Sequence, residues 1–238
     1  MEGDDEEEEE EEDTVNITTR ILTSNNATDE ILLAPKTRNA MKCWSQSCLW
    51  KKGSNGLVTI PFTTSSQFTS LERQKIAYAK RAFNSFTCLH FVPGQSQYDY
   101  ISIENKGGCY SHLGRMGGRQ VLSLNRRGCV YHGTIQHKIN HALGFQHEQT
   151  RSDRDPHVRI NWDYIPHEKA FNFYRQATNN LNTPDDYTSI MHYGKTAFSN
   201  QRGKDSITPI PNPNVQIGQR KGMSYWDIVR INRLYGCQ

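Results

Sequence analysis

Three histidines near the middle of the chain have the spacing of a metal site. His137 and His141 are four residues apart, so a helix would place both imidazoles on one face, one turn apart. Gly144 can adopt the left-handed backbone conformation that reverses the chain, which would bring His147 round as a third ligand. Three imidazoles on zinc leave a fourth position open for water, as in catalytic rather than structural sites. Among nine histidines one such pair is unremarkable, but three that frame a glycine are much less expected by chance, and we predict one Zn²⁺ per chain.

The hydrophobic pattern predicts the elements that would position these histidines. A helix over 134–143 would carry the first two and end at Gly144. Short apolar runs before it predict four strands, at 57–62, 89–92, 100–103 and 121–124. Pro61 lacks a backbone N–H and therefore marks an edge or the end of the first strand. Residues 151–222 are polar and irregular. The predicted fold class is α+β, with an N-terminal sheet and a looser C-terminal half.

Two further helices have recognisable starts. Thr69-x-x-Glu72 is a capping-box signature, and apolar residues after it recur at helical spacing over 70–86. We expect the basic residues of this helix, Lys80 among them, to form a solvated face. Ser224-x-x-Asp227 opens a last helix, whose apolar stripe is predicted to be Ile228, Ile231 and Leu234.

The charge is divided unevenly along the chain. Eleven of the 25 acidic residues fall within residues 1–13, where there is no Lys or Arg, so this block is expected to be solvated and disordered. An acidic tail that shields a basic body is the alternative interpretation. Residues 39–238 carry 25 basic and 12 acidic residues, a net charge of +13. No nucleic-acid motif accompanies the basic residues, and no apolar run is long enough to span a bilayer, so neither nucleic acid nor membrane is the expected partner.

Several features favour the secretory route. Asn16-Ile17-Thr18 and Asn26-Ala27-Thr28 are glycosylation acceptors, and the six cysteines are even in number. No signal peptide is visible, and we expect the true start of the precursor to be missing. Pro35-Lys36-Thr37-Arg38 is a plausible cut site for a trypsin-like protease. The domain boundary is predicted at Arg38/Asn39, which leaves 1–38 as a disordered prosegment remnant and 39–238 as the functional domain.

The chain resembles the astacin family of zinc endopeptidases. The pattern His-x-x-x-His-x-x-Gly-Phe-x-His-Glu over 137–148 is similar to the family's zinc motif, and Ser189-Ile190-Met191-His192-Tyr193 resembles its Met-turn. The start of the body, 39–48, is similar to that of fish hatching enzymes within the family. The resemblance covers residues 39–238. It implies a metzincin-type fold with zinc in the cleft between the two halves, and a monomer that cleaves an extracellular, egg-envelope protein.

The resemblance also implies roles for individual residues. Met191 would pack beneath the metal, and Tyr193 would be a weak extra ligand that swings away to hydrogen-bond the oxyanion of the reaction intermediate. Glu148 would receive the new ammonium group of Asn39 after cleavage at Arg38. The implied disulfides are Cys88–Cys237, Cys109–Cys129 and an additional local pair, Cys43–Cys48.

One residue departs from the family at the position that matters most for catalysis. The family has a glutamate directly after the first zinc ligand, which takes a proton from the attacking water and passes it to the leaving amine. Here this residue is Lys138. A protonated lysine can do neither; zinc would lower the lysine pKa, so a neutral amine acting as base is conceivable. We predict that zinc binding persists while hydrolysis is strongly impaired.

The prosegment also departs from the family. Family prosegments carry a Gly-Asp pair whose carboxylate caps the zinc, but residues 14–38 contain no glycine. A decayed paralogue, a truncated gene model and a natural pseudoenzyme are three alternatives that fit these departures. Two functions therefore compete: a secreted zinc endopeptidase, and a zinc-binding module that uses its basic surface to hold an acidic extracellular protein without cleaving it.

Overall fold

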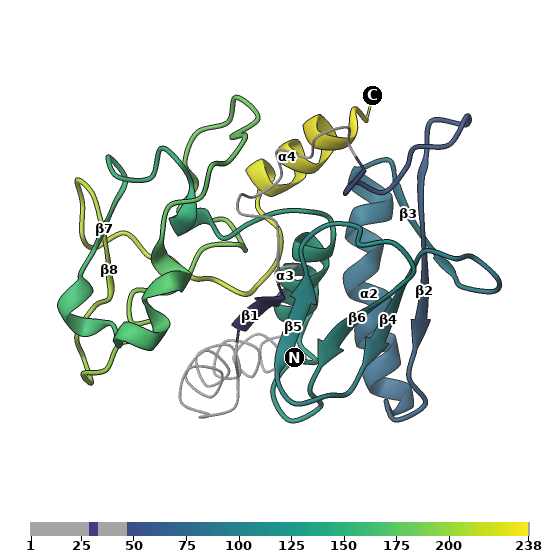
Figure 1. The fold of residues 1–238 in the computed structure, drawn as a ribbon, viewed down its shortest axis with the longest axis horizontal. Coiled ribbons are helices and arrows are strands. Elements are labelled where there is room, and N and C mark those ends of the chain that lie inside the picture. Colours follow the sequence, from purple (N-terminus) through teal and green to yellow (C-terminus); the bar gives the residue numbers. More distant parts are fainter. Residues whose placement is uncertain (1–28, 33–46, 238) are drawn as a thin grey trace, which may run out of the picture.

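The computed structural model describes residues 29–32 and 47–237, which form two halves on either side of a central helix (Figure 1). The helices and strands are β1 (Asp29–Leu32), β2 (Val58–Thr64), α2 (Ser70–Phe86), β3 (Leu89–Pro93), β4 (Tyr100–Glu104), β5 (Cys109–His112), β6 (Arg119–Leu124), α3 (His132–Ala142), β7 (Val158–Ile160), β8 (Ile207–Pro209) and α4 (Tyr225–Tyr235). Within the described residues, 3₁₀ turns lie at Glu148–Thr150, Trp162–Tyr164 and His167–Phe173. The predicted α+β class is confirmed. No helix of the described residues is long and apolar enough to cross a membrane.

The first half is a six-stranded sheet packed against two helices. Its strand order is β1-β5-β6-β4-β2-β3, and all neighbours run parallel except β5 and β6. Helices α2 and α3 pack against each other and against the sheet. Their buried faces meet the inward side chains of the strands in one apolar core, which includes Ile60, Phe83, Leu122, Ile135 and Ile139. This core fixes α3, the helix that carries two of the histidines.

Helix α2 begins and ends where the sequence predicts. Thr69 and Glu72 form the complete capping box, and Ile76 and Phe83 are buried. The expectation that Lys80 belongs to a solvated face is wrong. Lys80 is only 7% exposed, and its Nζ lies 2.9 Å from the centroid of the Phe62 ring. The helix sits close enough to β2 that the lysine stem is covered, and the ring face offers the ammonium a partial substitute for water.

Pro61 lies inside a strand rather than at its end. It pairs with Val92 of β3, whereas β4 joins the other side of β2 only from Phe62 onward. The missing N–H of Pro61 therefore falls where β2 has a neighbour on one side only, so the strand continues without losing a ladder hydrogen bond. Pro61 therefore does not end the strand, whereas the alternative of an edge position holds locally, where β2 has one neighbour.

Strand β1 belongs to the segment that we expected to be disordered. Asp29–Leu32 pairs in parallel with Cys109–His112 of β5. A sheet edge offers unpaired N–H and C=O groups that any extended segment can satisfy, so pairing here does not depend on an apolar pattern. Strand β5 was likewise not predicted. The other residues of the expected disordered segment, 1–28 and 33–38, lie outside the described residues.

The C-terminal half is as poor in regular structure as predicted. Its described strands are the three-residue pair β7 and β8. Where strands would pair backbone groups with each other, buried side chains here bond to the backbone. For example, the Arg154 guanidinium donates to the carbonyls of Gln149 and Phe173 at 2.6 and 2.7 Å. A second apolar cluster, which includes Phe173 and Tyr193, lies beside them. This half is held by local polar contacts around a small core.

A disulfide ties the C-terminal end of the chain to the core, and a second one cross-links the N-terminal half. Cys88–Cys237 closes a separation of 149 residues, and Cys109–Cys129 joins β5 to the loop before α3. Both are pairs that the family resemblance implies; Cys43, and with it the Cys43–Cys48 pair, lies outside the described residues. Helix α4 has the predicted capping box, but only Ile231 of its predicted apolar stripe is fully buried.

Replacing Lys80 by Met should stabilise the fold most at low pH. Burial lowers the pKa of Lys80 to about 7. Below that pH the folded state holds a buried charge, whereas between about 7 and 10.5 only the unfolded state binds the proton, so wild-type stability rises with pH in this window. Urea unfolding of wild type and Lys80→Met from pH 6 to 10 should show a gap that shrinks as pH rises. The exposed Lys75→Met is the control for losing a surface charge, and a gap independent of pH would contradict the prediction.

Candidate metal centre

Helix α3 holds His137 and His141 in a fully packed environment. All of its residues from Gly133 to Ala142 are buried. The helix starts against residue 220: a Cβ at position 133 would lie 1.7 Å from the Arg220 carbonyl oxygen, so only glycine fits. The helix ends at Ala142, and Gly144 follows with φ +105°, a conformation that favours glycine. This reversal is the one predicted from the sequence.

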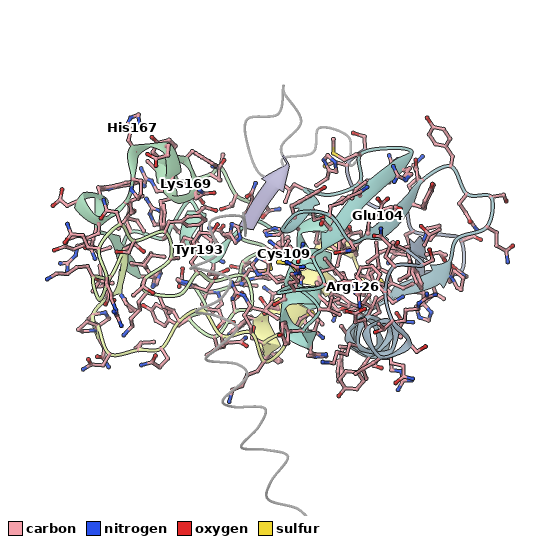
Figure 2. All side chains as sticks on the ribbon, turned by 90° about the horizontal axis from the view of Figure 1, so that it is seen from below. Glu104, Cys109, Arg126, His167, Lys169 and Tyr193 are labelled. Carbon is pink, nitrogen blue, oxygen red and sulfur yellow. A yellow bond between two sulfur atoms is a disulfide. The ribbon has the colours of Figure 1, made fainter. Side chains whose placement is uncertain are left out.

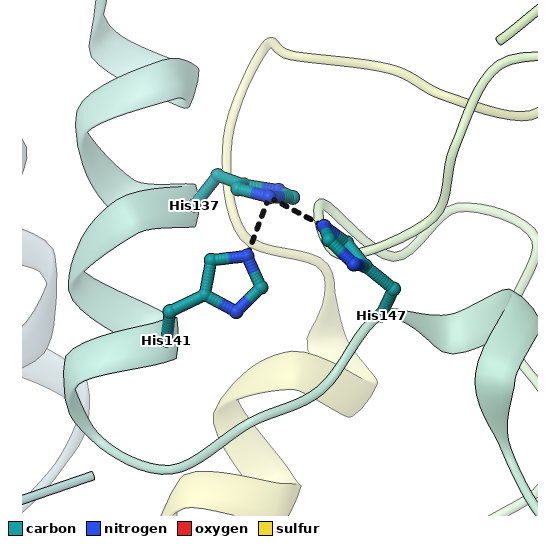
Figure 3. A group of neighbouring side chains, drawn as sticks. All are labelled: His137, His141 and His147. Atoms are coloured by element: carbon teal, nitrogen blue, oxygen red, sulfur yellow. Dashed lines mark hydrogen bonds between the residues drawn. The ribbon is translucent and has the colours of Figure 1, made fainter. Parts of the chain in front are cut away.

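The reversal brings the three histidines together (Figure 3). The Nε2 atom of His137 lies 3.0 Å from Nε2 of His141 and 3.2 Å from Nε2 of His147. Metal-binding atoms of all three lie within 4.8 Å of one another, and all three residues are buried. Tetrahedral zinc with bonds of about 2.0–2.1 Å to nitrogen would space its ligands about 3.3 Å apart. The three side chains therefore fit a zinc ion.

Backbone carbonyls fix the rings that point at this centre. Nδ1 of His137 lies 2.7 Å from the Ile190 carbonyl, and Nδ1 of His141 lies 2.8 Å from the Phe145 carbonyl. A carbonyl only accepts, so each Nδ1 carries the proton and each Nε2 presents a lone pair to the centre. Burial lowers the pKa of all three histidines well below the usual value, which keeps them in the neutral form that binds metals.

The turn over 189–193 passes beside His137 and His147. Met191 is 3% exposed, and its carbonyl accepts the backbone N–H of Glu148 at 3.0 Å. Asp227 anchors the turn, accepting from the Ser189 hydroxyl at 2.6 Å and the Ile190 N–H at 2.9 Å. The sequence identified Asp227 only as a helix-capping residue. Asp227 also holds Ser189 and Ile190, which lie 38 and 37 residues before it in the sequence. Contacts over such a separation cannot be predicted from a local sequence pattern.

Tyr193 lies over the third histidine. Its ring centroid is 4.3 Å from that of His147, and the residue is 2% exposed. The buried hydroxyl has no hydrogen-bond partner among the described residues. A buried polar group without a partner is costly, so the hydroxyl is available for a metal or substrate oxygen. This geometry fits the predicted role of Tyr193 without testing it.

Lys138 is buried beside the histidines. It is 1% exposed, and burial lowers its pKa well below the usual value, with the nearby Arg220 cation adding to the effect. The charge on Lys138 also contributes to the lowered pKa values of His141 and His147. A cation at this place works against a bound metal ion, whereas a carboxylate would support it.

Glu148 follows the third histidine but its carboxylate is already engaged. Arg230 donates to both of its oxygens at 2.8 and 2.7 Å, and the Asp186 N–H donates at 2.9 Å. Burial raises the pKa of Glu148 to about 7, against the opposing effect of Arg230 and Arg151. Asn39, its predicted partner, lies outside the described residues.

Asp185, a buried carboxylate near Glu148, was not predicted from the sequence. The Asp185 side chain is 1% exposed, neither of its oxygens has a hydrogen-bond partner among the described residues, and burial raises its pKa to about 6. No motif singles it out, since an Asp in a polar stretch is ordinary. The Arg151 guanidinium lies 3.9 Å from it, the far limit of an ion pair.

Zinc should stabilise the fold through these histidines. At about 100 times the dissociation constant, zinc should raise the thermal unfolding midpoint by about 5–10 °C, since only the folded state assembles the site. His141→Gln should abolish the shift. His167→Gln is the control, because His167 is exposed and lies at the periphery, far from Tyr193 (Figure 2). Equal shifts in both variants, or none in wild type, would contradict this site.

The chain is similar to known proteins over most of its length. A profile of the Astacin peptidase family matches residues 42–236. High choriolytic enzyme 1 of Oryzias latipes is 64% identical over 229 residues, 94% of this chain and 85% of that protein. Low choriolytic enzyme of the same fish is 50% identical over 220 residues, 90% and 81% of the two chains.

Solved structures agree with this match. The structure of high choriolytic enzyme 1, described as a hatching enzyme zinc-protease from medaka, has a TM-score of 0.82 and 64% identity, and the match covers 84% of this chain and 100% of that chain. Myroilysin, at 17% identity and a TM-score of 0.57 over 80% of this chain and 96% of its own, shares the fold alone. With this match over most of its length, and three histidines placed to hold the family's zinc ion, the chain belongs to the astacin family of zinc metalloendopeptidases.

Proposed function

We propose that this chain is a secreted zinc endopeptidase of hatching-enzyme type whose turnover is impaired by Lys138. The observation that carries the proposal is the buried cluster of three Nε2 atoms, converging at 3.0 and 3.2 Å in a chain 64% identical to a choriolytic enzyme. By that likeness, the proposed substrate is an extracellular protein of the egg envelope. We expect the chain to act as a monomer, with no nucleic acid or membrane partner.

Four side chains divide the work at the proposed active site. His137, His141 and His147 would hold zinc, which when bound polarises the scissile carbonyl and lowers the pKa of water. The unpaired Tyr193 hydroxyl would donate a hydrogen bond to the oxygen of that carbonyl as it becomes negative. These three histidines and the tyrosine are present and buried. At position 138, where the family has a carboxylate that accepts the proton of the attacking water, this chain has a lysine.

Lys138 is the reason to expect weak hydrolysis. A charged ammonium cannot accept a proton, and it repels the metal that the histidines hold. Its burial favours the neutral amine, since burial lowers the pKa of Lys138, and that amine can accept a proton. The amine nevertheless offers no negative charge to attract the attacking water. Loss of a general base typically costs about 10²–10⁴-fold in rate.

The Lys138→Glu variant should therefore hydrolyse peptides about 10²–10⁴-fold faster than wild type. Zinc content and cleavage of a fluorogenic peptide are measured on the same preparations of the processed protein. Lys138→Gln is the matched control, because it removes the charge without supplying a base; it should retain zinc and stay slow. Wild type that cleaves casein as fast as Lys138→Glu would overturn the impairment.

The same experiment separates the alternative function. A zinc-binding module that holds an acidic extracellular protein is supported by the net charge of +13 over 39–238. Zinc without turnover in wild type, together with retained binding to egg-envelope protein, would favour this module. Turnover by wild type at a rate within the usual range of enzymes would favour the endopeptidase.

We also propose that residues 1–38 are a removable leader and 39–238 the functional unit. The family match over 42–236 supports this division. Strand β1 of the leader occupies the edge of β5, where an extended substrate could add to the sheet, so the leader and a substrate would compete for the same edge. This competition offers a form of latency that does not need a Gly-Asp pair.

Cleavage after Arg38 would release the amino group of Asn39. Glu148 was the predicted acceptor, and it remains a candidate, but Arg230 already neutralises it. Asp185, whose side chain is buried and has no hydrogen-bond partner among the described residues, is a second candidate, because an added ammonium would satisfy its oxygens. Both lie near Arg151, at 3.6 and 3.9 Å, so the new amino terminus would join one buried charge network.

Limited trypsin digestion should yield a stable product that begins at Asn39. Arg38→Ala should block that product, whereas Arg20→Ala, in the same leader, should leave it unchanged. N-terminal sequencing and intact mass identify the cut. A stable product that begins elsewhere, or an unaltered pattern in Arg38→Ala, would show that the division at Arg38 is wrong.

A further inference from the structure

Arg220 lies outside the zinc motif in sequence but contacts the turn beside the metal centre. Its Nη1 atom donates to the carbonyls of Ile190 at 3.1 Å and His192 at 3.0 Å, which are both in the Met-turn. It also lies 2.9 Å from the carbonyl of Gln219. The guanidinium is partly buried and reaches the turn from a loop 30 residues further along the chain than Ile190.

One of these carbonyls also orients a histidine of the metal centre. The Ile190 carbonyl accepts from Nδ1 of His137 at 2.7 Å as well as from Arg220. A carbonyl oxygen has two lone pairs and can accept both donors. The N–H of the same residue is held by Asp227 at 2.9 Å. Both main-chain polar atoms of Ile190 are therefore fixed, one of them jointly by Arg220 and the imidazole.

The loop that carries Arg220 has little freedom to move. Gly218 has φ +88°, and a Cβ there would lie 2.4 Å from the backbone of Gly194. The Arg220 carbonyl leaves no room for a side chain at Gly133 of α3. Gln219 donates to the Thr188 carbonyl at 2.7 Å. Residues 218–220 are thus wedged between the start of α3 and the Met-turn.

We propose that Arg220 is a positioning residue of the metal centre, which holds the Met-turn so that the Ile190 carbonyl keeps the His137 ring aimed at zinc. The proposal rests on the metal role of His137. Partners of a histidine's second nitrogen fix its ring orientation, and their loss typically weakens metal binding about 10–100-fold. Arg220 acts one step further out, through the carbonyl itself. Without its hydrogen bonds the Ile190 carbonyl loses one of the two donors, Arg220 and His137, that orient it.

The test compares Arg220→Gln and Arg220→Lys with Arg233→Gln. Arg233 is a matched control, because it also donates to two loop carbonyls, of Leu181 at 2.8 Å and Asn182 at 2.7 Å, but is exposed and takes no part in the metal centre. Zinc dissociation constants are measured by competition with a chelator, and the visible spectrum of the cobalt-loaded protein reports ligand geometry. Thermal unfolding of the metal-free proteins reports purely structural damage.

Arg220→Gln should bind zinc about 10-fold more weakly, the lower end of the range for direct partners, and change the cobalt spectrum, with Arg220→Lys between it and wild type. Arg233→Gln should alter neither reading. Zinc affinity and cobalt spectrum equal to wild type in both Arg220 variants would overturn the proposal, even if their metal-free stability falls. If Arg220→Gln does not fold, Arg220→Lys decides by the same readings. Failure of wild type itself to bind zinc would instead sink the metal assignment, so the two claims fail separately.

Discussion

Three imidazoles that converge in a buried place are the constraint on which the rest of this structure depends. The Nε2 atom of His137 lies 3.0 Å from that of His141 and 3.2 Å from that of His147. Backbone carbonyls accept hydrogen bonds from the Nδ1–H groups of His137 and His141. The Nε2 atoms of these two rings therefore face each other with their lone pairs. Such an arrangement is unfavourable unless a cation sits at the centre. The fold must therefore hold the rings in place until the metal is bound.

The surrounding elements hold the three rings in these positions. Helix α3 fixes two of the rings, and its own position comes from the apolar core that it shares with α2 and the sheet. Gly144 turns the chain so that the third ring arrives. At Ile190, whose carbonyl orients His137, the carboxylate of Asp227 in α4 accepts a hydrogen bond from the N–H, and Arg220 donates one to the carbonyl. The capped end of α4 thus serves the metal centre as well as the helix.

Local signals in the sequence predicted the parts that depend on local physics. The spacing of His137 and His141, the glycine reversal and both capping boxes involve residues within a few positions of one another, and all are present. Partners far apart in sequence were not predictable. The Glu148–Arg230 pair spans 82 residues, and the burial of Lys80 against Phe62 depends on how α2 packs on the sheet. Strand β1 pairs with β5, a partner 80 residues further along the chain, which a local pattern does not reveal.

The change that we propose for Lys138 concerns the chemistry of the centre and leaves the convergence of the histidines in place. The three histidines converge with lysine at this position, and the carbonyls of Ile190 and Phe145 orient the rings of His137 and His141. X-ray absorption at the zinc edge of the wild-type protein tests this most directly. We predict three imidazole nitrogens at about 2.0–2.1 Å and one further light atom around the zinc. Absence of bound zinc, or a shell with fewer than three imidazoles, would contradict the account.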